Sequence, residues 1–214
     1  MLNLLSFVLN PFYENTYIVW DDFTKDAMII DPGCLSDSEE NELKEFIDSK
    51  RLNLKYLINT HCHIDHIFGN AFFKDNYNLK FLAPEGDVFL LDNATEKAGM
   101  FGVEIKPSPK PDGYLSEDQP IFLGESEVRF LFTPGHTPGE YCVYFPLENI
   151  CICGDVLFKE SIGRTDLWGG NFAQLLQSIR QKLFTLPDDT TVYSGHGEPT
   201  TIGHEKKNNP FLNA

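Results

Sequence analysis

Apolar residues in this chain gather in short runs separated by turn-forming residues, and most of these runs have the β-branched and aromatic content of strands. The first three runs are residues 2–9, 16–20 and 27–31. Asn10-Pro11 separates the first pair and Asp21-Asp22 the second. The pattern therefore predicts a β-meander at the start of the chain.

Helical periodicity first appears over residues 36–50. Ser36 precedes Glu39 by three residues, which is the spacing of a capping box at a helix start. One side of this helix is apolar and carries Leu43, Phe46 and Ile47. The sequence therefore predicts a helix that begins at Ser36 and packs through this side.

Strands and helices then alternate, with predicted strands at residues 54–59 and 80–83 and predicted helices at 70–76 and 86–97. Pro107, Pro109 and Pro111 follow, and proline removes backbone donors and restricts φ. This segment is expected to be irregular, and a loop over a site is one interpretation of it.

A second β-rich part has predicted strands at residues 128–132, 141–145, 149–153 and 191–194, followed by a C-terminal loop. Before the last strand, a helix is predicted over residues 171–183 with Asn171 as its N-cap. Its apolar positions have helical spacing and are Phe172, Leu175, Leu176, Ile179 and Leu183.

Two β-rich halves with helices outside predict an α/β protein with a four-layer αββα sandwich. A length of 214 residues is closer to one domain of about 150 residues than to two. No repeat or low-complexity segment suggests a linker. We therefore expect residues 1–214 to form a single domain.

Charge narrows the possible partners. The chain has 17 Lys and Arg against 32 Asp and Glu, a formal charge of -15, and the acidic residues are spread along it. Affinity for a phosphate backbone comes mainly from basic side chains that release counterions. A nucleic-acid partner is therefore not expected.

The chain has no apolar window of the ~20 residues that a membrane span needs. Residues 1–9 are apolar but have no basic n-region and no small-residue cleavage site, so we interpret them as a strand and not as a signal peptide. The odd number of cysteines, five, favours reduced, buried thiols. These features predict a cytoplasmic protein without a membrane partner.

Three of the six histidines lie in one heptapeptide, Thr60 to His66, between a predicted strand and a predicted helix. Four metal-competent groups on a tight turn cannot all reach one ion, but a turn can direct His61 and His63 one way and Asp65 and His66 the other. This division suggests two adjacent metal ions. The alternative is a solvated turn that is merely rich in histidine.

Three further groups stand where an apolar, strand-like run ends in turn residues: His136, Asp155 and His196. Neighbouring glycines allow the backbone to turn sharply there. Each residue alone could be an ordinary core or surface group. Together with the heptapeptide they supply five imidazoles and two carboxylates, which suits a dinuclear hydrolytic centre. The sixth histidine, His204, lies in a polar stretch and is taken as ordinary.

These motifs resemble the metallo-β-lactamase superfamily in order and approximate spacing, over about residues 10–211. The motifs are residues 60–66, Gly135-His136-Thr137, Gly154-Asp155 and 194–197, with Ile30-Asp31-Pro32-Gly33 upstream. The resemblance implies the αββα fold and two divalent metal ions, zinc first, with iron or manganese as alternatives.

Transferred onto matching positions, the resemblance assigns His61, His63 and His136 to the first metal. It assigns Asp65, His66 and His196 to the second, with Asp155 bridging the two. Asp65 would also orient the nucleophilic water. Asp31 and Thr137 would lie beside the metal ligands, where a carboxylate or hydroxyl can orient an imidazole through its other nitrogen.

Within the superfamily the chain is most similar to glyoxalase II, the hydroxyacylglutathione hydrolase, in its short single-domain branch. The likeness rests on residues 158–166, Gly169-Gly170 and 209–211. It implies hydrolysis of a small-molecule thioester such as S-lactoylglutathione. The chain does not match the C-terminal helical domain that contacts glutathione in the long enzymes. Glutathione recognition is therefore less well supported than thioester hydrolysis.

Several alternatives remain open from the sequence. Arg164 lies where the long enzymes contact glutathione, so it is a candidate substrate ligand, but it could instead pair with Asp166. Residues 163–166, which include Arg164 and Asp166, also resemble persulfide dioxygenases. Those enzymes hold one iron at positions matching His61, His136 and Asp155. A lactonase, or metals that only stabilise the fold, are further alternatives.

True β-lactamases usually carry Cys or Ser in place of Asp155, which argues against antibiotic hydrolysis. Cys62 is not expected to be a ligand, because neighbours on an extended turn point in opposite directions.

Overall fold

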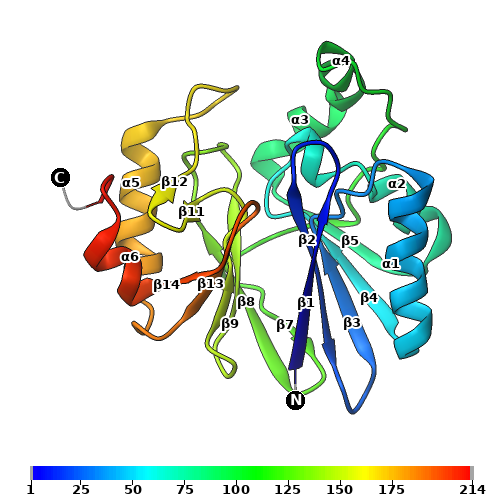
Figure 1. The fold of residues 1–214 in the computed structure, drawn as a ribbon, viewed down its shortest axis with the longest axis horizontal. Coiled ribbons are helices and arrows are strands. Elements are labelled where there is room, and N and C mark those ends of the chain that lie inside the picture. The colour runs from blue at the N-terminus through cyan, green and yellow to red at the C-terminus, as the bar shows by residue number, and fades with distance from the viewer. Residues whose placement is uncertain (1, 213–214) are drawn as a thin grey trace. The chain divides into compact units, whose positions relative to one another are not determined.

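The computed structural model describes residues 2–212, and they fall into two compact units. Unit 1 comprises Met1–Tyr114 with Leu123–Glu125, and unit 2 comprises Leu115–Phe122 with Ser126–Ala214. Each unit contains helices and one six-stranded sheet (Figure 1), apart from strand β7, which crosses the boundary between them. The mixed α/β composition agrees with the sequence, whereas the expectation of a single domain stays a prediction.

The sheet of unit 1 has its strands in the order of the sequence. They are β1 (Leu2–Leu9), β2 (Glu14–Asp21), β3 (Asp26–Ile30), β4 (Asn53–Ile58), β5 (Lys80–Ala83) and β6 (Gly113–Tyr114). The first three form the predicted antiparallel meander, and β3 to β6 are parallel. The carboxyl ends of β3, β4 and β5 therefore meet at one edge, which is where open α/β sheets bind ligands.

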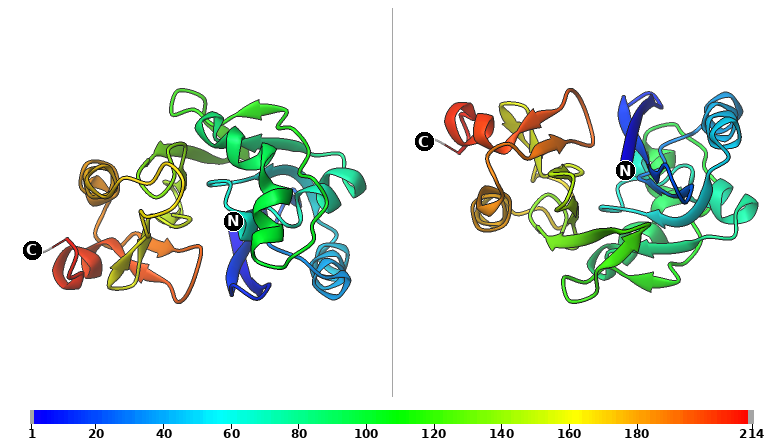
Figure 2. Two further views of the ribbon diagram at one scale, coloured as in Figure 1. Left: turned by 90° about the horizontal axis from the view of Figure 1, so that it is seen from above. Right: turned by 90° about the horizontal axis from the view of Figure 1, so that it is seen from below.

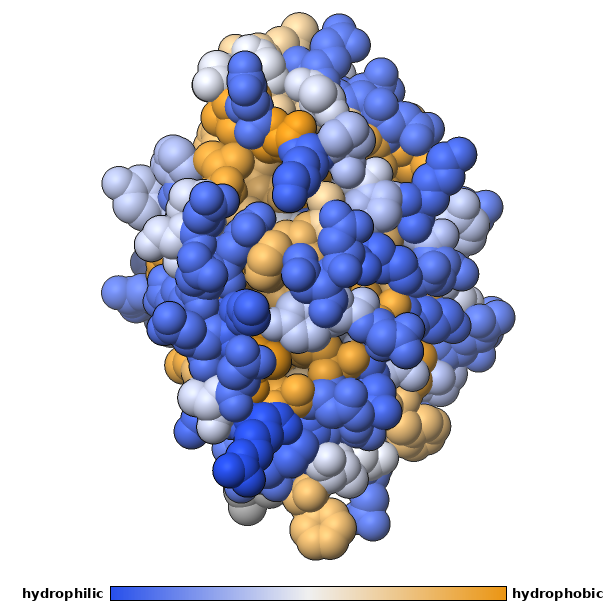
Figure 3. Space-filling view, turned by 90° about the vertical axis from the view of Figure 1, so that its right-hand side faces the viewer, coloured by the Kyte–Doolittle hydropathy of each residue, from blue (hydrophilic) through white to orange (hydrophobic). Residues whose placement is uncertain are grey.

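Helices cover one face of this sheet (Figure 1). They are α1 (Asp37–Lys50) and α2 (Asn70–Asn76), whereas α3 (Val88–Asp92) and α4 (Ala94–Met100) lie at the end of the sheet that carries the heptapeptide, where Ala98 of α4 packs on Ile64 and Phe68. Leu43 and Ile47 of α1 and Phe73 of α2 join Ile29 and Phe81 of the sheet in one buried cluster. Figure 3 views the side of unit 1 on which α1 lies, where hydrophilic side chains predominate and apolar ones form separate, smaller areas.

The predicted helix over residues 86–97 is wrong in one respect, because it is divided into a 3-10 turn, α3 and α4. Asn93 separates the two α-helices in non-helical backbone. Its side-chain amide donates to the carbonyl oxygen of Phe89 at 2.6 Å. Asn side chains compete for backbone groups in this way and weaken helix continuation.

The capping box of α1 is present as predicted: Glu39 N donates to Ser36 Oγ at 3.3 Å, and Ser36 N donates to Glu39 Oε2 at 2.9 Å. Replacing Ser36 by alanine is expected to lower the free energy of unfolding by about 1 kcal/mol, because one amide at the helix start loses its acceptor. Urea denaturation measures this change. Ser49→Ala on the same helix is the control, and a loss of equal size there would contradict the capping explanation.

The sheet of unit 2 has the strand order β14-β13-β10-β9-β8-β7. The strands are β7 (Ile121–Leu123), β8 (Ser126–Phe132), β9 (Tyr141–Phe145), β10 (Ile150–Ile152), β13 (Thr191–Tyr193) and β14 (Thr200–Thr201). A separate hairpin consists of β11 (Leu157–Phe158) and β12 (Ser161–Ile162). Pairing makes β8, β10 and β13 point the same way, so their carboxyl ends lie at one edge.

Two helices, α5 (Phe172–Gln181) and α6 (Ile202–Asn208), lie on one face of this sheet (Figures 1 and 2). Asn171 caps α5 as predicted, since its side chain accepts a hydrogen bond from Gln174 N at 3.1 Å. Phe172 was expected on the apolar side but is 50% exposed, because it stands at the first helical position, ahead of the buried Leu175.

The C-terminal segment was predicted as a loop, and α6 corrects that expectation. Its sequence is polar and shows little periodicity, so the pattern gave no signal for a helix. Thr201 caps α6 by accepting a hydrogen bond from His204 N at 3.2 Å, and Ile202 is buried in the core of unit 2. The cap and this contact therefore support the helix.

All five cysteines are buried and free, as predicted. No helix among residues 2–212 has the length and apolar character that crossing a membrane requires, and the 14-residue α1 is the longest of them.

Candidate metal centre

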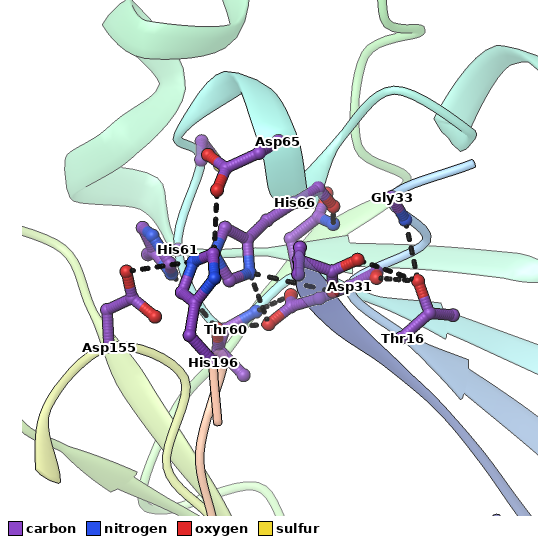
Figure 4. A network of polar contacts seen from close by, with 12 residues as sticks. Thr16, Asp31, Gly33, Thr60, His61, Asp65, His66, Asp155 and His196 are labelled. Carbon is purple, nitrogen blue, oxygen red and sulfur yellow. Dashed lines mark hydrogen bonds and ion pairs between the residues drawn. The ribbon is translucent and has the colours of Figure 1, made fainter. Parts of the chain in front are cut away.

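The histidine-rich heptapeptide follows β4 and ends in a 3-10 turn, Ile64–His66. His61 and His66 are fully buried, and their ring centroids are 4.1 Å apart. The centroids of His61 and His63 are 4.9 Å apart, and Asp65 Oδ2 lies 3.7 Å from His66 Nε2. Unit 1 thus brings the four predicted ligands of this segment close together, and Figure 4 shows three of them, His61, Asp65 and His66.

Asp31 follows β3 and lies beside the start of this loop, because β3 and β4 are parallel neighbours. Asp31 Oδ1 accepts from Thr60 N at 2.7 Å, and Oδ2 accepts from Thr60 Oγ1 at 2.6 Å (Figure 4). His66 Nδ1 lies 3.2 Å from Asp31 Oδ2. The carboxylate therefore fixes both the first residue of the loop and the ring of its last histidine.

These contacts determine which imidazole nitrogen carries the proton. Asp31 is an acceptor, so His66 donates through Nδ1–H. The Thr60 hydroxyl donates its hydrogen to Asp31, so Thr60 Oγ1 can only accept from His61 Nδ1, 3.1 Å away. Both rings then keep their lone pair on Nε2, and a metal ligand needs that lone pair.

Glu14 and Thr16 were not among the predicted site residues, yet both are fully buried beside Asp31. Thr16 Oγ1 lies 2.9 Å from Glu14 Oε2 and 2.9 Å from the carbonyl oxygen of Asp31, and it accepts from Gly33 N at 2.8 Å. Glu14 Oε1 is 3.9 Å from His66 Nδ1, and burial raises the pKa of Glu14 well above its usual value. No sequence signal marked Glu14, which precedes the predicted strand at residues 16–20 and is the first residue of β2.

Cys62 lies between two histidines, but its side chain belongs to the hydrophobic core of unit 1. Burial, reinforced by the nearby Asp87, raises the pKa of its thiol well above the ordinary value. A metal ligand must be a thiolate. The structure therefore places Cys62 as a core residue, in agreement with the sequence argument.

In unit 2, Asp155 and His196 each stand three residues beyond a strand, after β10 and β13, which are parallel neighbours. Asp155 Oδ2 is 3.5 Å from His136 Nε2 and 3.7 Å from His196 Nε2. Gly154 before Asp155 has φ of 49°, the left-handed region, so the chain turns sharply there. Unit 2 therefore gathers its three predicted ligands, with the two imidazoles on the Asp155 carboxylate.

Two backbone contacts hold this group in place. His136 Nδ1 lies 2.7 Å from the carbonyl oxygen of Arg164, so Nδ1 is the donor and the lone pair is on Nε2, as in unit 1. Asp155 N donates to Glu140 Oε1 at 2.9 Å, and Glu140 is fully buried. Glu140 was not predicted, because no sequence signal joins it to Asp155.

The Arg164 guanidinium donates two hydrogen bonds to the Asp166 carboxylate, from Nε to Oδ1 at 2.7 Å and from Nη2 to Oδ2 at 2.7 Å. This hydrogen bonding lowers the pKa of Asp166 to about 2. The geometry matches the structural alternative for Arg164, and its role as a substrate ligand stays a prediction. Thr137 is fully buried, and His204 pairs with Glu160 at 2.9 Å.

The two groups of side chains have the chemistry of a metal centre. Imidazole nitrogens and carboxylate oxygens suit zinc, iron or manganese, and three rings with Nδ1 tied to an acceptor are already in the tautomer that binds through Nε2. The side chains around Asp31 in unit 1 and those around Asp155 in unit 2 therefore fit divalent ions.

Known proteins resemble this chain over its whole length. The family model of the metallo-beta-lactamase superfamily matches residues 9–196. Hydroxyacylglutathione hydrolase GloC of Haemophilus influenzae is 37% identical, over 100% of this chain and 99% of that protein.

Two solved structures are also similar. The B3 metallo-beta-lactamase BLEG-1 has a TM-score of 0.89 and 34% identity over 99% of this chain and 100% of its own. The structure of TTHA1623 in a di-iron-bound form has a TM-score of 0.86 and 32% sequence identity, and the match covers 97% of this chain and 100% of that chain. These likenesses confirm the predicted α/β fold class.

Proposed function

Because the chain belongs to the metallo-β-lactamase superfamily, with the predicted likeness to glyoxalase II, we propose that it is a dinuclear metal-dependent hydrolase of a small-molecule thioester. The observation that carries the proposal is the hydrogen bonding of His61, His66 and His136 at Nδ1. This bonding presents three imidazoles to a metal through Nε2.

We assign the ligands as the resemblance implies. The first ion would be held by His61, His63 and His136 and the second by Asp65, His66 and His196, and Asp155 would be a ligand of both. Such ions, when bound, polarise a carbonyl oxygen and make a water nucleophilic near neutral pH. The protein's own task is to fix the ligands: Asp31 and the Arg164 carbonyl hold imidazole rings, and Glu140 holds the backbone of Asp155.

Asp65 has a catalytic role in this proposal. Its carboxylate lies beside His66, in the 3-10 turn, where it can accept a hydrogen bond from the attacking water and so orient it. A thiolate leaves readily, so the reaction needs no strong general acid. We therefore propose that the substrate is a small-molecule thioester. We also propose that the protein acts in the cytoplasm.

The test is a substrate panel on purified protein with its metals counted. Thiol release from S-lactoylglutathione is expected, with two metal ions per chain. The other substrates are an acyl homoserine lactone, a β-lactam and glutathione persulfide. Oxygen uptake with the persulfide is measured with an oxygen electrode. One iron per chain with oxygen uptake would refute the hydrolase proposal in favour of a dioxygenase, and exclusive ring opening would identify a lactonase or β-lactamase.

The role of Arg164 can be separated from its pairing with Asp166. If Arg164 binds a substrate carboxylate, Arg164→Ala is expected to raise KM for S-lactoylglutathione by about tenfold, roughly 1.4 kcal/mol, with kcat little changed. Steady-state kinetics provide the measurement. Lys159→Ala removes a similarly exposed ion pair with Glu198 and is the control. An unchanged KM would leave Arg164 as a loop-holding residue only.

A further inference from the structure

We propose that Asn10 is a positioning residue that holds the backbone of Asp65 and thereby maintains the second metal site selectively. Asn10 is at the turn between β1 and β2, 55 residues from Asp65 in sequence. The inference rests on the proposed function, since that proposal defines the second site as Asp65, His66 and His196.

The Asn10 side-chain amide bridges two carbonyl groups. Nδ2 donates to the carbonyl oxygen of Gly33 at 2.9 Å and to that of Asp65 at 3.1 Å. An amide nitrogen has two hydrogens, so both are used by these two contacts. One side chain therefore ties the turn after β3 to the residue that ligates the second metal.

The rest of Asn10 is fixed as well, so the amide cannot easily move. Its backbone N donates to Glu39 Oε1 at 2.7 Å, in the capping box of α1, and its Oδ1 accepts from Phe12 N at 2.9 Å. Its φ is 52°, a left-handed conformation that Asn tolerates better than most residues. Its carbonyl accepts from Tyr13 N at 3.2 Å.

Close packing at Gly33 supports the same role. A Cβ atom at Gly33 would lie 2.7 Å from Asn10 Nδ2, 2.6 Å from the carbonyl oxygen of Asp65 and 2.0 Å from Glu14 Oε2. No side chain fits in this space, so the Asn10 amide, the Gly33 backbone and the Asp65 backbone are in direct contact. A change in the Asn10 side chain is transmitted to Asp65 without an intervening layer.

The selectivity follows from how the loop is anchored. Asp31 holds its first residue, Thr60, and Asn59 Nδ2 donates to the carbonyl oxygen of His66 at 3.1 Å. Asn10 holds Asp65. Loss of the Asn10 amide therefore loosens a ligand of the second metal, whereas the His61 end of the loop keeps its own anchor.

The decisive variant is Asn10→Asp. Aspartate keeps the size, tolerates left-handed backbone and still accepts from Phe12 N, but it replaces the amide nitrogen by an oxygen that faces two carbonyl oxygens. Asn10→Gly, which accommodates the positive φ and has no side chain, is a second variant in case the first does not fold. Asn76→Asp is the matched control, since Asn76 Nδ2 donates to the carbonyl oxygen of Phe72 away from the site.

Each protein is loaded with zinc, passed through gel filtration and its metal counted, with circular dichroism as the folding check. We expect two ions per chain in the wild type and in Asn76→Asp, and one ion in Asn10→Asp or Asn10→Gly. Two tightly held ions in the Asn10 variants, or the loss of both, would overturn the inference. A wild type that holds two ions but hydrolyses no thioester would refute the proposed function alone, because metal retention is measured without a substrate.

Discussion

Replacing Asp155 by alanine is expected to reduce turnover by on the order of a thousandfold or more, equivalent to roughly 4 kcal/mol of transition-state stabilisation. Asp155 Oδ2 lies within 3.7 Å of both His136 Nε2 and His196 Nε2, so its removal takes away the carboxylate that these two imidazoles share. Thiol release and metal content are measured on the same preparation. Asp188→Ala, which removes an exposed carboxylate paired with Lys206, is the control.

His61→Ala belongs to the same prediction and is expected to be as severe, because His61 is a proposed ligand of the first metal and is fully buried. Its control is His204→Ala, which removes an imidazole that pairs with Glu160 and is not a proposed ligand. Persistent turnover in a protein with both His61 and Asp155 replaced would disprove the metal-centred mechanism. Loss of turnover in His204→Ala would show that the assay reports folding and not the site.

The second large effect is expected at Gly163. A Cβ atom there would lie 1.9 Å from the carbonyl oxygen of Asp155 and 3.2 Å from the Cβ of His136. Gly163→Ala must therefore move the backbone that carries these two ligands. A displacement of about 1 Å can cost a hundredfold in rate, and overpacking lowers stability by about 1–3 kcal/mol. The rate of thioester hydrolysis and the melting temperature are the measurements.

Gly99→Ala is the matched control for this substitution. Gly99 lies in α4, a Cβ atom added there would meet nothing within 4 Å, and alanine favours helix over glycine. The control is expected to melt at the same temperature or slightly higher, with activity unchanged. Equal activity in Gly163→Ala and Gly99→Ala would show that the close approach at Gly163 does not constrain the site.

The sequence by itself determined the elements that a regular pattern encodes. Alternating and continuous apolar runs located the long strands, the Ser36 and Glu39 spacing located the start of α1, and Asn171 located the start of α5. These features depend on neighbours within one or two turns. Short strands such as β11 and β12, and the polar helix α6, have too few residues or too little periodicity to be recognised in this way.

The candidate site shows the same contrast, between the residues that can bind a metal and the groups that hold those residues in place. The metal-binding residues could be recognised from the sequence, because His and Asp gather in turns after apolar runs. The groups that hold them were not: Asn10 reaches Asp65 across 55 residues, and the carbonyl of Arg164 reaches His136 across 28. The first contact uses an ordinary side-chain amide and the second a backbone oxygen, and no sequence pattern marks either group as part of a metal site. Only the tertiary structure, by bringing strand ends and turns together, decides which of them orients a ligand.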